Sequence, residues 1–145
     1  MKSKCIKIKR LSEKSVIPTY GSEYSAGFDL YSCEDILLMS KQSYIFDLEF
    51  STEIPEGYYV SIVPRSGLAC KKGVTVINAP GTIDSDYRGS WKVGLINHSN
   101  NQVQIKEGDR IAQGIMLKYE NIIFEEVENL DKTERNEGGF GSTGV

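Results

Sequence analysis

Apolar and polar side chains alternate with a period of two along much of this chain. Residues 58–63 (Tyr-Tyr-Val-Ser-Ile-Val), 91–96 (Trp-Lys-Val-Gly-Leu-Ile) and 103–105 (Val-Gln-Ile) alternate or run as short β-rich segments. Because successive side chains of a strand point to opposite faces, this period predicts strands. No long stretch between chain-breaking residues shows helical spacing, so the only helix that we expect is a turn or two near residues 67–72.

Turn-forming residues interrupt this pattern at short, regular intervals. Many short strands separated by turns are typical of a β-sandwich or barrel, so we expect an all-β fold. The apolar pattern ends near Val127, which predicts a β domain over residues 1–127. Residues 128–145 then form a polar linker and a glycine-rich arm. The turn signals lie at residues 18–21, 55–57, 73, 80–81, 97–101 and 107–108.

The arm combines glycines with one arginine, one phenylalanine and two hydroxyls, in the order Arg-Asn-Glu-Gly-Gly-Phe-Gly-Ser-Thr-Gly from Arg135. So many glycines make a helix or strand costly in chain entropy, and we expect the arm to be flexible without a ligand. Arg135 and the hydroxyls of Ser142 and Thr143 can donate to phosphate oxygens, while Phe140 can stack on a base. This composition predicts a lid for a nucleotide; a disordered, solubilising terminus is the alternative.

Length and composition describe one domain of 145 residues with 39% hydrophobic content. The chain has no apolar run of membrane-spanning length, and its first ten residues alternate charge with isoleucine, unlike a signal peptide. Cys5, Cys33 and Cys70 are odd in number and far apart, which suits a reducing compartment. We therefore expect a soluble cytoplasmic or otherwise intracellular protein without a membrane partner.

The net charge of -3 argues against a nucleic-acid-binding protein, which would normally carry a basic surface. The arginines nevertheless lie where anion recognition would need them. Arg65, Arg88, Arg110 and Arg135 each stand near a glycine or next to an aspartate. Guanidinium groups beside flexible backbone suit phosphate binding, although surface ion pairs explain each arginine taken singly equally well.

Two segments near the predicted strands carry further polar groups. Asp29 lies in an alternating stretch, and if it points inward it needs a cation, an arginine or a metal-bound water as its partner. Arg65, Ser66 and Gly67 follow a strand and open the predicted helix, so they can present a guanidinium, a hydroxyl and an N–H to an anion. A simple turn is the alternative for this second segment.

Residues 78–89 form the segment richest in chemistry, with turn residues at one end and two aspartates, a tyrosine and an arginine at the other. Such a hairpin can hold a planar ligand against its backbone while Asp84 or Asp86 reaches a water; a solvated hairpin is the alternative. In residues 108–114, an acid–arginine pair leads into a strand, and Gln113 can bind water or phosphate. A surface ion pair is the alternative there.

The segments AGFDLYS, PRSGLA, APGTIDSDYRG, GDRIAQ and RNEGGFGSTG appear in the order and approximate spacing of the five motifs of the trimeric dUTP diphosphatases. The chain resembles that family from about Lys7 to its last residue. The resemblance implies a β-sandwich of jelly-roll type and a homotrimer whose active sites draw on all three chains. It also implies Mg2+-dependent hydrolysis of dUTP to dUMP and pyrophosphate, which keeps uracil out of DNA and supplies dUMP for dTMP synthesis.

The resemblance also implies roles for individual residues. Asp84 resembles the general base that deprotonates the attacking water. Tyr87 resembles the ring that packs on the deoxyribose, and Asp29 the aspartate that holds outer waters of Mg2+, with the metal bound directly by the phosphates. The remaining implied substrate contacts are Asn78, Gly81 and Ile83 for uracil, Phe140 and Gly141 for stacking, and Arg65, Ser66, Gly67, Gln113, Arg135, Ser142 and Thr143 for the phosphates and water.

Three residues depart from the family pattern, namely Ser90, Gly114 and Asn136. We expect Asn136 to accept a left-handed backbone and Gly114 to weaken strand packing. Two alternatives to the hydrolase stay open: a dCTP deaminase of the same fold, and a nucleotide sensor with altered catalysis. A zinc-dependent deaminase is excluded, because His98 is the only histidine and the chain has no C-x-x-C.

Overall fold

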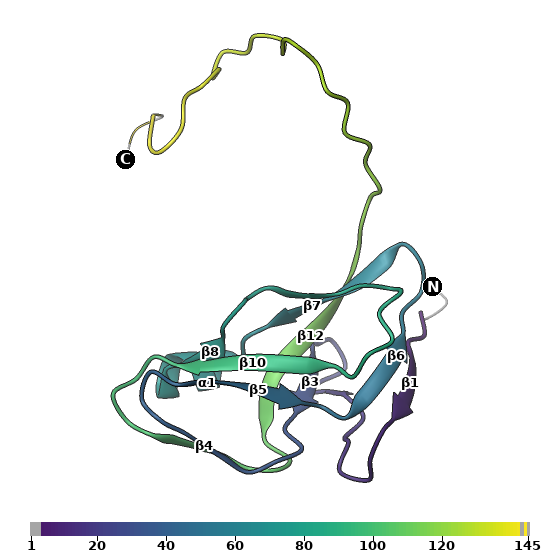
Figure 1. The fold of residues 1–145 in the computed structure, drawn as a ribbon, viewed down its shortest axis with the longest axis vertical. Coiled ribbons are helices and arrows are strands. Elements are labelled where there is room, and N and C mark those ends of the chain that lie inside the picture. The colour runs from purple at the N-terminus through teal and green to yellow at the C-terminus, as the bar shows by residue number, and fades with distance from the viewer. Residues whose placement is uncertain (1–3, 143, 145) are drawn as a thin grey trace.

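The computed structural model describes residues 4–142 and residue 144. Within these residues the chain folds into short antiparallel strands and one short helix (Figure 1). The elements are β1 (Lys7–Arg10), β2 (Thr19–Tyr20), β3 (Phe28–Tyr31), β4 (Ile36–Leu38), β5 (Ser43–Asp47), β6 (Phe50–Glu53), β7 (Tyr58–Val63), α1 (Ser66–Lys72), β8 (Val74–Val76), β9 (Gly81–Ile83), β10 (Lys92–Asn97), β11 (Val103–Ile105) and β12 (Arg110–Lys118).

The strands form a five-stranded sheet in the order β2-β3-β12-β7-β9, a three-stranded sheet in the order β5-β10-β8, and the pairs β1-β6 and β11-β4. A single cluster of buried apolar side chains contains Leu30 and Val60 from the larger sheet and Phe46, Val76 and Leu95 from the smaller one. The two sheets therefore share one core. The predicted all-β, jelly-roll type architecture is confirmed.

Local patterning accounts for several elements as predicted. The alternating residues 58–63 and 103–105 form β7 and β11, and residues 91–96 match β10 to within one residue. In β10 the side chains of Val93, Leu95 and Asn97 are buried, while the intervening residues are partly or fully exposed. Burial of each such aliphatic side chain stabilises the fold by about 1.5–3 kcal/mol.

The helix α1 is the one predicted near residues 67–72. Gly73 ends it with a left-handed backbone (φ 69°), and its N–H donates to the carbonyl of Ala69 at 3.0 Å. Glycine adopts this conformation without the steric cost of a Cβ. Lys71 and Lys72 lie in the last turn, where positive charge is favourable. Among the described residues, no helix is long and apolar enough to cross a membrane.

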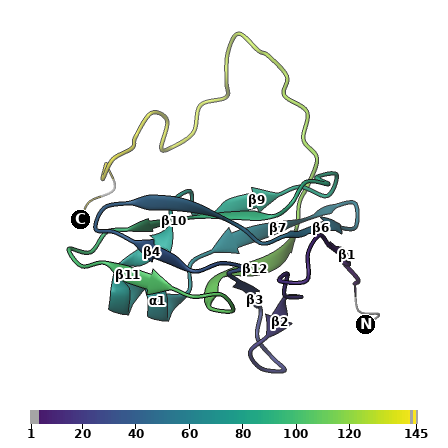
Figure 2. The ribbon, with the colours of Figure 1, turned by 60° about the horizontal axis from the view of Figure 1, so that its bottom comes forward.

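The last strand ends at Lys118, and Tyr119 still donates its N–H to the carbonyl of Gly57 at 3.1 Å. The chain then leaves the domain and extends away from it (Figures 1 and 2). Residues 120–137 are exposed, including Ile123 at 96% and Phe124 at 90%. The domain boundary at Val127 stays a prediction. The apolar residues that suggested it belong to the extended segment and not to a strand.

Candidate active site

Asp29 is a buried carboxylate held between two arginines. It lies in β3 and is 7% exposed. Its Oδ1 lies 3.0 Å from Nε of Arg65, and its Oδ2 lies 3.6 Å from Nη1 of Arg110. A buried carboxylate without a partner would be costly, and the two guanidinium groups supply the compensation. Of the three predicted kinds of partner, the described contacts are with arginine.

The same aspartate orients the arginines toward a polar hollow of about 270 Å³. Arg65 is the N-cap of α1, with extended backbone, and Ser66 and Gly67 are exposed at the first turn of the helix. A Cβ on Gly67 would meet no atom within 4 Å, so its backbone borders open space. The lining residues are Gly21, Ser25, Gly27, Asp29, Arg65, Ser66, Gly67, Arg110 and Gln113.

Gln113 faces this hollow from β12, next to Asp29 in the sheet. Its Nε2 donates to the carbonyl oxygen of Pro64 at 3.2 Å. Pro64 connects the end of β7 to Arg65. A Cβ on Gly27 would lie 2.9 Å from Oε1 of Gln113, closer than real side chains approach. The glycine at position 27 therefore leaves the room that the Gln113 side chain occupies.

Four residues of this hollow were not predicted as site residues: Gly21, Ser25, Gly27 and Arg110. Arg110 was recognised in the sequence only as an arginine next to an aspartate. Its approach to Asp29 depends on the pairing of β12 with β3, in which Arg110 stands opposite Tyr31. Gly27 and Arg110 lie within the motif segments AGFDLYS and GDRIAQ, so these motifs were the sequence signal that could have identified them as site residues.

The hairpin of residues 78–90 forms a second part of the candidate site. β9 pairs with β7, and Gly81 stands opposite Ile62. A Cβ on Gly81 would lie 3.2 Å from Cβ of Ile62 and 3.5 Å from Nδ2 of Asn78. This close packing holds the exposed Asn78 side chain near the backbone of β9, in which Ile83 is the last residue.

Asp84 and Tyr87 follow β9 in an exposed turn. The Tyr87 N–H donates to the carbonyl of Asp84 at 3.2 Å. Asp84 borders an open hollow of about 750 Å³ together with Asp86, Arg88 and Glu53. The hydrogen bond from Lys7 at 2.8 Å lowers the pKa of Glu53, which keeps that neighbour ionised.

The two hollows lie at opposite ends of β7. Ile83, the residue before Asp84, pairs with Val60, and Arg65 follows Val60 by five residues. The pairing is antiparallel, so Asp84 lies one position further from Arg65, level with Tyr59. At about 3.3 Å per residue, six residues place the predicted base about 20 Å from Arg65 along the strand direction. Within one chain the structure therefore brings Asp29, Arg65 and Gln113 together, but it does not bring Asp84 to them.

The arm also lies apart from both hollows. Arg135 donates from Nε to the carbonyl of Gly138 at 2.7 Å, and Phe140 is fully exposed. Gly141 and Ser142 are exposed beyond it. The predicted phosphate ligand Thr143 lies outside the described residues.

The departures Gly114 and Asn136 have local explanations. Asn136 has φ 43°, so the expected left-handed backbone is confirmed. Gly114 is buried beside Phe28, and a Cβ there would lie 2.5 Å from Cζ of that ring. The expectation that Gly114 weakens packing was wrong, because the aromatic ring fills the space that a side chain would take.

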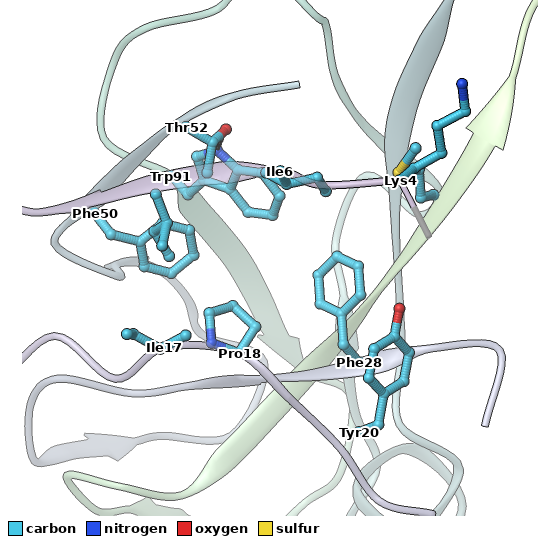
Figure 3. Close-up of a pocket in the computed structure, with 11 residues that line it drawn as sticks. Lys4, Ile6, Ile17, Pro18, Tyr20, Phe28, Phe50, Thr52 and Trp91 are labelled. Atoms are coloured by element: carbon cyan, nitrogen blue, oxygen red, sulfur yellow. Dashed lines mark hydrogen bonds between the residues drawn. The ribbon is translucent and has the colours of Figure 1, made fainter. Parts of the chain in front are cut away.

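A third hollow, of about 250 Å³, lies away from all predicted site residues. Figure 3 shows Ile6, Ile17, Pro18, Phe28 and Trp91 around it. This mostly apolar lining does not suit a triphosphate.

Metal ligation was tested against the side chains that the structure describes. Within residues 4–142 and 144, no three His, Cys, Asp or Glu side chains gather closely enough to hold a metal ion. Asp29 is a single carboxylate, and a carboxylate has about four acceptor positions. After the contacts with Arg65 and Arg110, acceptor positions are left for water, which fits a metal that keeps its own water ligands.

Comparison with known proteins places the chain in one family. The dUTPase family model matches residues 13–144. The deoxyuridine 5'-triphosphate nucleotidohydrolase of Nautilia profundicola is 50% identical over 96% of this chain and 98% of its own. That of Helicobacter hepaticus is 48% identical over 100% of this chain and 92% of its own. The dUTPase of Staphylococcus bacteriophage 80alpha, solved with dUPNHPP, is 25% identical, with a TM-score of 0.90 over 99% of this chain and 100% of its own. The chain belongs to the dUTPase family.

Proposed function

We propose that this protein hydrolyses dUTP to dUMP and pyrophosphate by attack of a water molecule on the α-phosphorus. The observation that carries the proposal is the polar hollow in which Asp29 orients two arginines beside Ser66 and Gln113, in a chain that belongs to the dUTPase family. The reaction supplies dUMP and removes a nucleotide that would bring uracil into DNA. Its substrate occurs inside the cell, where we propose that the protein acts.

The polar hollow suits the triphosphate. Arg65 and Arg110 carry positive charge that Asp29 only partly neutralises, and their guanidinium groups match phosphate oxygens in shape and donor geometry. The Ser66 hydroxyl and the N–H groups of Ser66 and Gly67 add neutral donors at the start of α1. A negatively charged protein can therefore bind a polyanion through one local patch.

The hairpin suits the nucleoside. Asn78 and the backbone of Gly81 and Ile83 offer donors and acceptors to the edge of uracil, and Tyr87 offers a ring to the deoxyribose. The Asp84 carboxylate, close to Tyr87 in the turn, accepts a proton from the attacking water. The arm then closes over the nucleotide, with Phe140 stacked on the base and Arg135, Ser142 and Thr143 on the phosphates.

Assembly into a homotrimer with shared sites is part of the proposal. The separation of about 20 Å between Asp84 and Arg65 is too long for one dUTP held entirely by one chain's hairpin and polar hollow. The exposed apolar side chains of Ile122, Ile123 and Phe124 also favour a partner, since such patches mark interaction surfaces. Groups from different chains would complete each site.

Mg2+ is the proposed cofactor, and Asp29 would hold it by accepting hydrogen bonds from its water ligands. When bound, Mg2+ would neutralise phosphate charge and orient the phosphates of the substrate. Asp29 holds Arg65 and Arg110 in place, and the carbonyl of Pro64 holds Gln113.

The decisive experiment measures pyrophosphate release from dUTP, dTTP, dCTP and UTP, each with Mg2+ and with excess EDTA. We expect release from dUTP alone, with a large loss under EDTA. Pyrophosphate release from several nucleotides would contradict the proposed selectivity. Nucleotide binding without any release would indicate a sensor, and ammonia release from dCTP would indicate a deaminase.

A further inference from the structure

The ring of Tyr87 is held by a short chain of hydrogen bonds that leaves the hairpin and ends in another strand. The Tyr87 hydroxyl donates to the carbonyl oxygen of Ser90 at 3.0 Å. The Ser90 hydroxyl in turn donates to Oδ1 of Asp47, the last residue of β5. Asp47 stands opposite Lys92 in the β5–β10 ladder and lies outside all five motif segments.

Gly89 allows the Tyr87 ring to fold back over its own turn. A Cβ at position 89 would lie 2.6 Å from Cζ and 3.0 Å from Cε2 of the ring, so any other residue would push the ring away. The side chain of Tyr87 is still 41% exposed, which leaves ring surface available to a ligand. The ring is thus backed by the turn and open to solvent.

The backbone of the turn is held by hydrogen bonds from the Arg88 side chain. Arg88 donates from Nη1 to the carbonyl oxygens of Ser85 at 2.7 Å and Tyr87 at 3.2 Å. These bonds hold the backbone of the turn, but they do not reach the aromatic ring. The orientation of the ring depends on its hydroxyl and therefore on where the carbonyl of Ser90 lies.

We propose that Ser90 and Asp47 are positioning residues that set the Tyr87 ring and thereby the strictness with which the site excludes a ribose 2'-hydroxyl. This inference rests on the proposed function, in which Tyr87 packs on the deoxyribose. A hydroxyl bound to a carboxylate is a stronger anchor than a neutral pair. Without it, residue 90 can shift, the ring can tilt, and the sugar site gains room for one more oxygen.

Ser90 is one of the positions where this chain departs from the family pattern. In this chain a small hydroxyl at position 90 reaches a carboxylate on β5, which ties the substrate hairpin to the smaller sheet. The neighbouring Trp91 is already fixed, because it is buried and its backbone bonds to Leu48 and Phe50 at 2.9 Å each. If Trp91 alone held residue 90, loss of the Ser90 hydroxyl would leave the Tyr87 ring in place, and the experiment below tests this.

The primary test compares kcat/KM for UTP and dUTP in the full-length protein and in Ser90→Ala. We expect the UTP to dUTP ratio to rise about fivefold, the equivalent of one hydrogen bond. Ser90→Thr keeps the hydroxyl and should keep the ratio of the unchanged protein. Ser43→Ala, an exposed serine at the other end of β5, is the matched control and should leave the ratio unchanged.

Asp47→Ala tests the second bond of the chain. It should raise the ratio at least as much as Ser90→Ala does, because it also removes the acceptor of the Glu49 N–H at 2.9 Å. Adding Ser90→Ala to Asp47→Ala should raise the ratio no further, since the bond between Ser90 and Asp47 is already lost. Equal losses for both nucleotides with a constant ratio would overturn the inference and assign Ser90 a merely structural role. A ratio that rises equally in Ser43→Ala would overturn it as well.

A readout independent of catalysis separates this inference from the proposed function. Protein labelled with 3-fluorotyrosine gives a ¹⁹F NMR signal for Tyr87, which Tyr87→Phe identifies. We expect this signal to shift or broaden in Ser90→Ala and to be unchanged in Ser43→Ala. A Tyr87 signal that is identical in Ser90→Ala contradicts the positioning role, whatever the activity. If the unchanged protein releases no pyrophosphate from dUTP, the proposed function fails instead.

Discussion

At the scale of single residues, the polar hollow beside Asp29 is shaped by side chains that hold one another in place. Asp29 is buried, yet its negative charge is compensated by Arg65 and Arg110, which it orients. Gln113 donates from Nε2 to the carbonyl of Pro64, while its Oε1 occupies space that a Cβ at position 27 would enter. The residues that contact the ligand and the residues that hold them can therefore be separated by mutation.

Asp84→Asn should lower kcat for dUTP by about a hundredfold or more, because an amide cannot take the proton from the attacking water. Binding should persist, since the predicted phosphate ligands lie in a different hollow. Stopped-flow turnover and calorimetric binding of a non-hydrolysable analogue measure the two effects. Near-normal turnover would transfer the role to Asp86 or remove it, and Asp86→Asn is the matched control.

Gly27→Ala should lower kcat/KM for dUTP by about tenfold or more, because the new Cβ displaces the Gln113 side chain from the hollow. Ala26→Ser, at the neighbouring exposed position, should have little effect. In a Gln113→Ala background, Gly27→Ala should cost much less, since the displaced atoms are gone. An equal loss in that background would exclude the proposed clash.

At the scale of elements, the chain divides into a sheet-bound part and an extended part. β3, β7 and β12 are neighbours in the five-stranded sheet and carry the polar hollow at one end. Beyond residue 119 the described part of the chain forms no strand. Within the described residues, the hydrogen bonds of the arm from Thr133 onward join arm residues to one another.

Truncation after Asp131 should therefore leave the midpoint of thermal unfolding nearly unchanged. Activity should fall by about a hundredfold or more, the scale expected when donors to a developing phosphate charge are lost. Differential scanning fluorimetry and the pyrophosphate assay measure the two properties on the same sample. A marked drop in Tm would indicate that the arm contributes to folding or assembly as well as to the reaction.

At the scale of the whole molecule, one chain carries the parts of a site but does not assemble them. The predicted base lies about 20 Å from the predicted phosphate ligand Arg65 along the direction of β7, and the arm extends away from both (Figure 1). An extended arm that orders only over a ligand can reach a neighbouring chain at low cost. This geometry supports the proposal of a site shared between the chains of a homotrimer.

Two variants that are each inactive should therefore regain activity when they are combined in mixed trimers. Asp84→Asn and the chain truncated after Asp131 are each expected to be nearly inactive, but co-refolded mixtures should regain activity well above the sum of the parents. Some mixed sites would contain an intact Asp84 from one chain and an intact arm from another. Unmixed trimers combined without refolding are the control. Hybrid trimers, verified by native mass spectrometry, that stay inactive would place the base and arm of each site on one chain.

The sequence alone determined the features that depend on near neighbours in the chain. Alternation predicted β7 and β11 to the residue, and the breakers around residues 67–72 predicted α1 to within one residue. The family motifs and the left-handed backbone of Asn136 were also predicted, because each is a property of a short local segment. The roles of individual site residues stay predictions that the experiments above address.

Only the tertiary structure decided which of these segments meet. Strand pairing joins residues far apart in the chain, and it brought Arg110 and Gly27 to the hollow of Asp29 and Gln113. The same pairing set Asp84 at the opposite end of β7, which no local pattern could indicate. Packing likewise reversed the expectation for Gly114, because the size of its site is set by the ring of Phe28 on a neighbouring strand. Local periodicity specifies the elements, whereas register and packing between distant elements specify the site.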